Sequence, residues 1–485
     1  PKNALFCRCP HLNQPKMLEL TWRLPTVVLL LSLPFATVAA EGFPRTRERA
    51  HAIREDIVHW RRQLHGRPEL MYQEHLTSQF IQEVLTSLDI PFTAGWAKNI
   101  RQNASRPILG PGGTGVVAEI GKGEPIVALR ADIDALPIVE ETPVPYRSQH
   151  PGQMHACGHD GHTSMLLGAA KLLKETQKSQ PGTVRLIFQP AEEGGAGAKR
   201  MLEEGVLNGV SRIFGLHLFP SLPSGVIGGR SGITMAAADF FDFRIRGRGA
   251  HGAMPHMGVD PVTASAAVVQ SLQSIVSRET DPLGAAVISV TKLACGDAYN
   301  VIPSSCTVGG TIRSLTSEGL DALRERVIEV STQVASAHRC VLENATFMPD
   351  SFPPTENDPE LWQWLHDSAG LQEGFGSSML WDLPPTMGGE DFAFYTQKIP
   401  GAFIFLGQGS TLSALSFAET ATSSSSSSNV ETAYRETVLV PTNTSLHSPW
   451  FHMDEDVLEL GSALHAHMAV TSLHALSRPA NSVDA

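Results

Sequence analysis

The chain has 485 residues, of which 42% are hydrophobic and 18% charged, and its formal net charge is −12. These values are typical of a globular protein with a large core, and the length favours two domains or one large domain with an insertion. No basic run carries interleaved aromatic residues, which argues against nucleic acid as a partner.

The N-terminal forty residues are expected to lie outside the folded part of the protein. Residues 1–16 precede Met17 and are interpreted as upstream translated sequence or a cloning remnant. Residues 17–40 contain Arg23, an apolar run and small residues up to Ala40, which predicts a signal peptide; a buried helix or a membrane anchor is the alternative. The apolar run has about ten residues, whereas a membrane span needs ~20. Since no later segment is long and apolar enough, we expect no membrane span.

Six cysteines are present, and their number argues against a disulfide framework. Cleavage near Ala40 would remove Cys7 and Cys9. If Cys157 is a metal ligand, three remain, and an odd number cannot all pair within one chain. Glycosylation sequons fit a secretory route, and they begin at Asn103, Asn344 and Asn443.

Two helices and two strands are predicted before the first polar cluster. The helices span 46–65 and 75–88, and the strands span 116–120 and 126–130. The second strand is followed by Asp132 and Asp134, which at i and i+2 lie on the same side of the chain. These carboxylates are interpreted as metal ligands or as partners that orient a ligating imidazole; a turn with solvated acids is the alternative.

The stretch 155–162 holds one thiol, three imidazoles and one carboxylate, separated by small residues that allow tight turns. Cys157 and His159, at i and i+2, can converge on a single ion. The alternatives are a polar loop with a chance histidine cluster and a Cys–His protease, whose partners normally come from distant parts of the chain. We interpret the stretch as part of a metal site. His155 and Asp160 are expected to orient the ligands, and His162 to belong to the start of a helix over 164–175.

Two further strands deliver polar residues at their ends. An apolar strand over 183–188 leads to Glu192 and Glu193 and then to glycines and a helix, which is where open α/β sheets bind ligands. Adjacent side chains point in different directions, so one acid can bind metal while the other transfers a proton; a solvated pair capping a helix is the alternative. A strand over 212–215 ends at His217, another candidate ligand.

Residues 236–347 follow the order β-α-β-β-α-β, which is the ferredoxin-like pattern and predicts an inserted satellite domain. Three of its polar residues have no evident packing role: His251, Asn300 and Arg313. Each alone would be an ordinary solvated residue. After residue 354 the α/β pattern returns, with a buried strand over 401–407 and a closing helix from 454 to 476.

Residues 410–443 contain six consecutive serines and no apolar periodicity, so we expect a solvated, disordered insertion there. The predicted organisation is an upstream segment 1–16, a signal peptide 17–40, a catalytic domain in two parts, 44–235 and 348–477, a satellite domain 236–347 and a tail 478–485.

Taken together, the motifs resemble the metal-dependent amidohydrolases related to aminoacylases, hippurate hydrolases and carboxypeptidase-like metallopeptidases, and most closely the plant hydrolases of auxin–amino acid conjugates. The likeness covers about 46–407 and 446–476. Its motifs are Arg61–His65, Arg130–Pro137, Met154–Thr163, Gln189–Gly194, Gly215–His217, Gly249–Pro255, Ser277–Leu283 and Gly388–Phe392. The resemblance implies an α/β fold: a two-metal catalytic domain with a mostly parallel central sheet flanked by helices, plus the ferredoxin-like α+β satellite as a lid.

The resemblance also implies the site. Two divalent ions, with Mn expected and Zn or Co as alternatives, would be bound by Cys157, His159, Glu193, His217 and His447. Glu192 would be the general acid/base, and His251 would stabilise the oxyanion. Asn300 and Arg313 would bind the carboxylate of the substrate, for which the forked guanidinium of arginine is suited. Such paired cations, ~4 Å apart, activate a water and polarise an amide carbonyl.

The expected reaction is hydrolysis of the amide bond of N-acyl amino acids, above all indoleacetyl conjugates, releasing auxin and an amino acid. A dimetal dipeptidase or general aminoacylase is the first alternative. A catalytically inactive conjugate-binding protein is the second, and only the serine-rich insertion before His447 favours it. In some relatives the histidine at the position of His251 serves a neighbouring subunit, so a homodimer through the satellite domain is an open alternative. The signal peptide implies the secretory pathway, either the endoplasmic reticulum lumen or secretion.

Overall fold

The computed structural model describes residues 42–98, 110–368, 379–409, 413–419 and 434–477. The predicted signal peptide, the upstream segment, the tail and the six serines lie outside the described residues. Within the described part of the chain, no helix combines the length and the apolar character that crossing a membrane requires.

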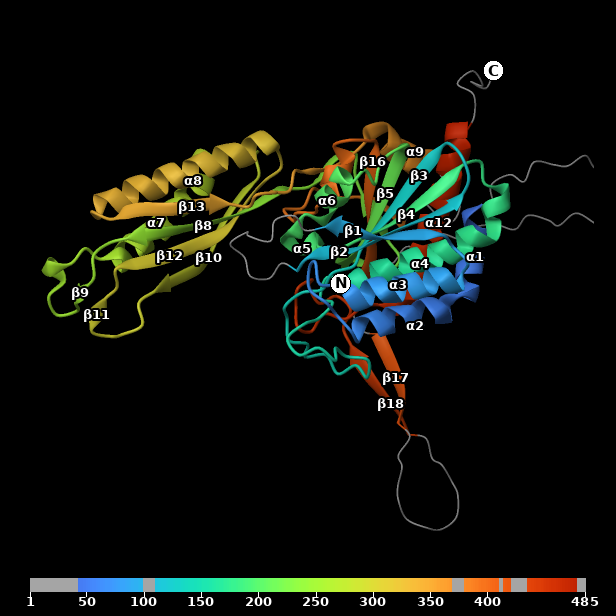
Figure 1. Ribbon diagram of the computed structural model, residues 1–485, viewed down its shortest axis with the longest axis horizontal. Helices are drawn as coiled ribbons and strands as arrows, with labels where there is room; N and C mark the ends of the chain where they lie inside the picture. Colours follow the sequence, from blue (N-terminus) through green and yellow to red (C-terminus); the bar gives the residue numbers. More distant parts are fainter. Residues whose placement is uncertain (1–41, 99–109, 369–378, 410–412, 420–433, 478–485) are drawn as a thin grey trace, which may run out of the picture. The chain divides into compact units, whose positions relative to one another are not determined.

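A central sheet of eight strands has the order β1-β2-β4-β3-β5-β16-β6-β15 (Figure 1). Its strands are β1 (Phe92–Lys98), β2 (Gly112–Gly121), β3 (Ile126–Asp132), β4 (Thr183–Gln189), β5 (Val210–Pro223), β6 (Ile227–Gly229), β15 (Leu380–Asp382) and β16 (Gly401–Gly409). Strands β4, β3, β5 and β16 are parallel neighbours, whereas β1–β2, β2–β4 and β16–β6 are antiparallel. The predicted α/β class is confirmed, with a mixed sheet that is parallel at its centre.

Two hydrophobic cores cover the two faces of this sheet, because successive strand residues point to opposite faces. In β3, Val127 and Leu129 belong to one core and Ala128 to the other. The first core contains helices α4 (His159–Thr176) and α12 (Leu458–Ser477), which contact each other and β3. Helices α1 (Phe43–Ala52), α2 (Arg54–His65) and α3 (His75–Ser87) pack around α4.

Three predicted boundaries differ from the structure. The single helix expected over 46–65 is two helices, because Ile53 leaves the helical region with φ −110°. Helix α4 begins at His159 rather than near 164, so its first turn carries His159, Asp160 and His162. The strand expected to end before His217 continues to Pro223, and His217 lies within β5 opposite Phe405 of β16.

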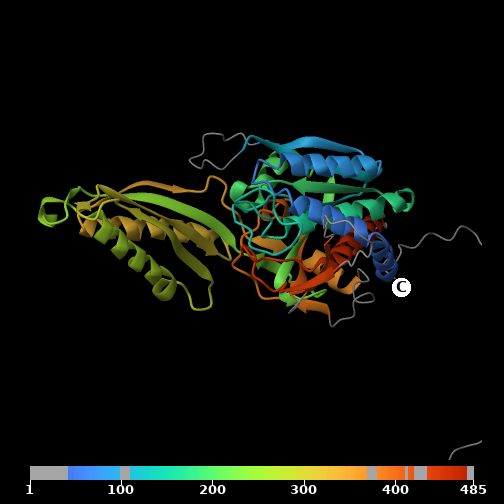
Figure 2. The same ribbon diagram turned by 90° about the horizontal axis from the view of Figure 1, so that it is seen from below.

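Residues 237–347 form a second sheet, antiparallel, with the order β10-β12-β8-β13. Its elements are β8 (Ala237–Arg246), α7 (Pro261–Ser274), β10 (Ala286–Cys295), β12 (Ser305–Ser314), α8 (Ser317–Ala337) and β13 (Val341–Phe347). Helices α7 and α8 pack together over one face of this sheet and enclose a core of its own (Figure 2). Asp260 caps α7 by accepting hydrogen bonds from Val262 N, at 2.8 Å, and Thr263 N, at 3.4 Å.

Two loops of the satellite domain also form a short antiparallel strand pair, β9 (Ala250–His251) with β11 (Val301–Ile302). Cys295 and Cys306 form a disulfide, and among the described cysteines Cys157 and Cys340 are free. Residues 413–419 (β17) and 434–440 (β18) form an antiparallel strand pair. The expectation that 410–443 lacks regular structure is therefore wrong for these strands.

Candidate active site

The candidate site lies where the parallel strands of the central sheet end. Asp132 is the last residue of β3, and Glu192 follows the turn after β4. His159 opens α4, and His217 comes from β5. Distant segments of the chain therefore converge on one place, as expected for the carboxyl ends of parallel strands.

The structure brings the five predicted metal ligands together. Cys157 Sγ lies 3.5 Å from His217 Nε2. Glu193 Oε1 lies 4.0 Å from His159 Nε2 and 3.2 Å from His447 Nε2. Potential ligand atoms lie within 4.8 Å of one another in overlapping groups, among them Cys157 with Glu193 and His447, and His159 with Glu192 and Glu193.

Backbone carbonyls fix the tautomers of two of these histidines. His159 Nδ1 lies 2.8 Å from Asp134 O, and His217 Nδ1 lies 2.7 Å from Leu218 O. Because a carbonyl oxygen only accepts, Nδ1 of each ring carries a hydrogen, and Nε2 is the atom that lies near the other candidate ligands. Burial lowers the pKa of His217 well below its usual value, which keeps this ring neutral. His217 thus presents the form that ligates a metal. Although burial opposes it, Asp132 and Asp134 raise the pKa of His159 to about 10, so a bound cation would have to displace the proton on its Nε2.

His162 is close to the same atoms but is not available as a ligand. Its Nε2 accepts a hydrogen bond from Leu218 N at 2.9 Å, and its Nδ1 donates to Asp132 Oδ1 at 2.6 Å. Both ring nitrogens are therefore occupied. This geometry supports the expectation that His162 belongs to the helix start rather than to the ligand set.

The donor atoms fit divalent cations. His159 Nε2 is buried without a hydrogen-bond partner, although buried polar atoms normally have one. Burial, together with Glu193 and Glu192, raises the pKa of the Cys157 thiol well above its usual value. The thiolate is the form that ligates metal, and at this position it is therefore stable only beside a bound cation.

Glu192 is buried beside these ligands. Its backbone N–H and that of Glu193 each donate to the Asp134 carboxylate at 3.0 Å, after a turn in which Ala191 has φ 58°. Burial, followed by the nearby Glu390 and Glu193, raises the pKa of Glu192 well above its usual value. A buried carboxyl group with a raised pKa beside candidate metal ligands is a candidate general acid/base.

His447 reaches the site through a backbone contact. Its N–H donates to Ala156 O at 2.8 Å, next to Cys157, and its backbone has φ 63°. The side chain is 52% exposed. The preceding β17–β18 segment thus leaves His447 beside Glu193, whose hydrogen bond raises the His447 pKa.

Sequence reasoning missed a buried charge network under the site. The fully buried Arg130 lies 2.9 Å from Asp132 Oδ2, 2.9 Å from Glu390 Oε1 and 3.0 Å from Asp391 Oδ1. It also donates to Gln189 Oε1 at 2.8 Å. These residues stand in three of the motifs that carry the family resemblance, but nothing in the linear sequence indicates that they pair.

The structure separates the predicted substrate-binding residues into two places. Arg313 Nη1 donates to Met387 O at 2.9 Å. Burial lowers the pKa of Arg313, and the charge of Glu192 offsets part of this effect. His251 and Asn300 are exposed and lie on neighbouring segments, with Gly252 N donating to Asn300 O at 2.7 Å. Among the described residues, the metal-ligand groups do not include His251.

Comparisons with known proteins agree with this geometry. The family model of peptidase family M20/M25/M40 matches residues 128–424. The chain is 40% identical over 432 residues to IAA-amino acid hydrolase ILR1-like 4 of Arabidopsis thaliana, covering 87% of this chain and 88% of the relative. It is 42% identical over 357 residues to N-acetyl-L-cysteine deacetylase of Bacillus subtilis, covering 73% and 81%. A solved dinuclear metal-binding M20 peptidase of Bacillus subtilis matches with a TM-score of 0.64 and 34% identity, covering 87% of this chain and 99% of that one.

Proposed function

Because the chain belongs to peptidase family M20/M25/M40, we propose that it is a metal-dependent amidohydrolase that cleaves indoleacetyl–amino acid conjugates into auxin and an amino acid. Hydrolysis of N-acyl amino acids is common to the plant and bacterial relatives, as their names state. The observation that carries the proposal is the buried Glu192, with its raised pKa, next to the convergent ligands Cys157, His159, Glu193, His217 and His447.

We assign the metal pair to these five ligands and expect Mn, with Zn or Co as alternatives. When bound, the ions would polarise the amide carbonyl and lower the pKa of the attacking water. The imidazoles of His159 and His217 are anchored by backbone carbonyls, and the backbone of Glu193 is anchored by the Asp134 carboxylate. Asp134 contributes twice, because its carbonyl orients His159 and its carboxylate orients the turn at Glu193.

Glu192 is proposed to move the proton. Its carboxylate would accept a proton from the attacking water and pass it to the nitrogen of the leaving amino acid. Its raised pKa favours the protonated form more than in an ordinary glutamate, which suits the delivery of a proton. Arg313, held by Met387 O, offers further guanidinium N–H groups to the carboxylate of the substrate.

His251 and Asn300 are proposed to complete the substrate site from the satellite domain. The backbone N–H of Ala253 donates to His251 Nδ1 at 3.1 Å. Since a backbone N–H only donates, Nδ1 is the acceptor and Nε2 carries a hydrogen. This tautomer suits a donor to the developing oxyanion. Asn300 would add an amide donor to the carboxylate of the substrate.

Two further assignments concern the location of the protein and its oligomeric state. The Cys295–Cys306 disulfide is typical of proteins that fold in an oxidising compartment, which supports the secretory pathway as the location. We also propose a homodimer through the satellite domain. Strand β10 is an edge of the satellite sheet and exposes Leu293, and edge strands are ready templates for pairing with a second copy.

The likeness to N-acetyl-L-cysteine deacetylase favours one second candidate, a general aminoacylase. A substrate panel separates the candidates. Purified protein reloaded with Mn would be given indoleacetyl-alanine, N-acetylcysteine and unacylated alanyl-alanine. Faster amino acid release from the first supports the proposal, and faster release from the second supports the aminoacylase. Release from the dipeptide alone, or from none of the three, would contradict both.

A further inference from the structure

We infer that the Cys295–Cys306 disulfide is a positioning element of the substrate site, which closes the loop carrying Asn300 and holds it against the segment of His251. The inference rests on the proposed function, because Asn300 and His251 are assigned there to the substrate. It goes beyond that assignment by naming a covalent bond on which their placement depends.

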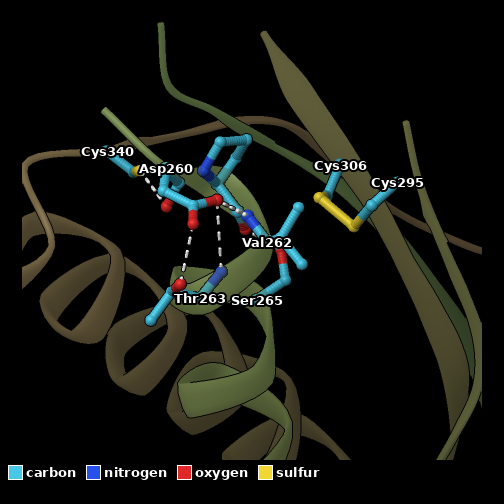
Figure 3. The surroundings of a disulfide bond; sticks show 8 residues. Asp260, Val262, Thr263, Ser265, Cys295, Cys306 and Cys340 are labelled. Carbon is cyan, nitrogen blue, oxygen red and sulfur yellow. Dashed lines mark hydrogen bonds between the residues drawn. A yellow bond between two sulfur atoms is a disulfide. The ribbon is translucent and has the colours of Figure 1, made fainter. Parts of the chain in front are cut away.

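The disulfide lies at the end of a strand pair. Cys295 is the last residue of β10, and it faces Cys306 of β12 in the antiparallel register, with 4.5 Å between their Cα atoms (Figure 3). The two cysteines are separated by eleven positions, and the segment between them carries Asn300 and β11. The bond therefore closes a short loop whose tip is the proposed carboxylate-binding residue.

The closed loop is joined to the His251 segment by backbone contacts. Strand β11 pairs with β9, with Val301 opposite His251. Gly252 N donates to Asn300 O at 2.7 Å, and Gly247 N donates to Ser304 O at 2.9 Å. A displacement of the disulfide loop would therefore displace His251 as well as Asn300.

Apolar packing contributes little to the order of this loop. Residues 296–301 are exposed, and so are the last residues of β10 before Cys295, including Leu293 at 53% exposure. The register of β10 against β12 also shifts between Val290 and Lys292. Segments with few buried contacts open readily, and closing a loop covalently removes much of that freedom. Within one chain, the disulfide is thus a covalent constraint where side-chain packing offers few others.

Bulk stabilisation of the satellite domain is a different role, and the domain has the means for it elsewhere. Its core is built from residues such as Phe243, Val268, Val308 and Val327, on the helix-covered face of the sheet. Removing the disulfide should therefore leave this core and the metal site intact. The specific consequence is a looser Asn300 loop.

The test compares the enzyme with C295S/C306S. We expect kcat/KM for indoleacetyl-alanine to fall about tenfold, because small misplacements of positioning groups carry penalties up to ~10²-fold. Most of the change should be in KM, since Asn300 is assigned to binding. In an N300A background the same double substitution should change kcat/KM by less than about twofold, because the two effects share one cause. Bound metal per chain should be unchanged.

C340S is the matched control, because Cys340 is a free, buried cysteine of the same domain. It should keep the kinetics of the unaltered enzyme. A second route avoids substitution. A trialkylphosphine gives two electrons to the S–S bond, water supplies the two thiol protons, and phosphine oxide forms. This treatment should raise KM in the unaltered enzyme and in C340S, but not in C295S/C306S.

Amide hydrogen exchange gives a readout independent of catalysis. Amides of 296–304 should exchange faster in C295S/C306S than in the oxidised enzyme, while those of β8 stay protected. Equal exchange and equal KM with and without the disulfide would overturn the inference while leaving the proposed function in place. If the oxidised enzyme hydrolyses no N-acyl amino acid, the proposed function fails. The constraint on the loop is then tested separately, because equal amide exchange of 296–304 in C295S/C306S and in the oxidised protein would overturn it.

Discussion

The Glu193 carboxylate oxygen Oε1 lies 3.2 Å from Nε2 of His447, although the satellite domain separates the two residues in the sequence. Glu193 follows β4, and His447 follows β18, beside the backbone of the Cys157 loop. This pair closes the ring of proposed ligands, and it makes the metal site depend on the correct placement of the last segment before α12.

His447→Ala is therefore expected to weaken metal binding. Changes to groups that only support ligands cost ~10–100-fold in metal affinity, so loss of a ligand should cost at least that. Bound metal per chain after dialysis, measured by atomic emission, gives the result. His256→Ala, at an exposed histidine of the satellite domain, serves as the control and should keep the full metal content. Equal metal content in both variants would remove His447 from the ligand set.

Glu192→Gln should abolish most of the activity while leaving the metals bound. Loss of a general acid/base typically lowers the rate ~10²- to 10⁴-fold. The amide is nearly isosteric, so the backbone bonds to Asp134 should persist. Glu203→Gln, at the end of helix α6 (Gly197–Glu203), is the control and should leave kcat unchanged. A kcat of Glu192→Gln within twofold of that of the unaltered enzyme would refute the assigned role. A negligible kcat in both the variant and the unaltered enzyme would favour the conjugate-binding protein.

Arg130→Met should destabilise the protein strongly. Removing one partner of a buried ion pair costs about 3–5 kcal/mol, because the remaining charges stay buried without compensation. Here the carboxylates of Asp132, Glu390 and Asp391 would be left in that state. Urea unfolding of the metal-free protein measures the change. Arg326→Met breaks only the exposed pairs with Glu279 and Glu329 and should change the free energy of unfolding little. Similar midpoints for the two variants would contradict the account.

The pair of His65 and Glu140 predicts a pH window of stability. His65 Nε2 lies 3.1 Å from Glu140 Oε1, and both side chains are buried. Although burial opposes it, hydrogen bonding to His65 lowers the Glu140 pKa from 4.5 to about 2. This contribution is present above 4.5 and is lost as the pH falls through about 2. Burial also opposes the charging of His65, but bonds to Asp160 and Glu140 raise its pKa above 6.5. That contribution is present below 6.5 and is lost as the pH rises through the raised value.

Both contributions are therefore complete between about pH 4.5 and 6.5. The measurement is the melting temperature of the metal-free protein against pH, for the unaltered chain and for Glu140→Gln. The difference between the two curves should be largest inside this window and should shrink on the acid side. A difference that does not vary between pH 2.5 and 6.5 would show that the pair contributes no pH-dependent stability.

The sequence predicts the parts of this protein that depend on local patterns. The β-α-β-β-α-β order predicted for 236–347 matches the order of the satellite elements β8, α7, β10, β12, α8 and β13. The spacing of Cys157 and His159 predicts a metal site before any fold is known. Each of these signals lies within a few residues, where periodicity and capping chemistry determine the structure.

Other features depend on contacts between distant residues, which no local pattern reveals. Arg130 pairs with Glu390 across the sheet, and Cys295 pairs with Cys306 because the register of β10 and β12 places them opposite. The length of β5 follows from its parallel pairing with β16, which extends the strand past His217. The family resemblance points to the motifs, but only the structure shows that both ring nitrogens of His162 are hydrogen-bonded within the protein.

Titration of the metal-free protein with Mn, with release of alanine from indoleacetyl-alanine as the readout, tests the central claim most directly. The account predicts no release without metal, and a rate that rises with added Mn and saturates near two ions per chain. Release of alanine at full rate by the metal-free protein, or no release at any Mn concentration, would contradict it.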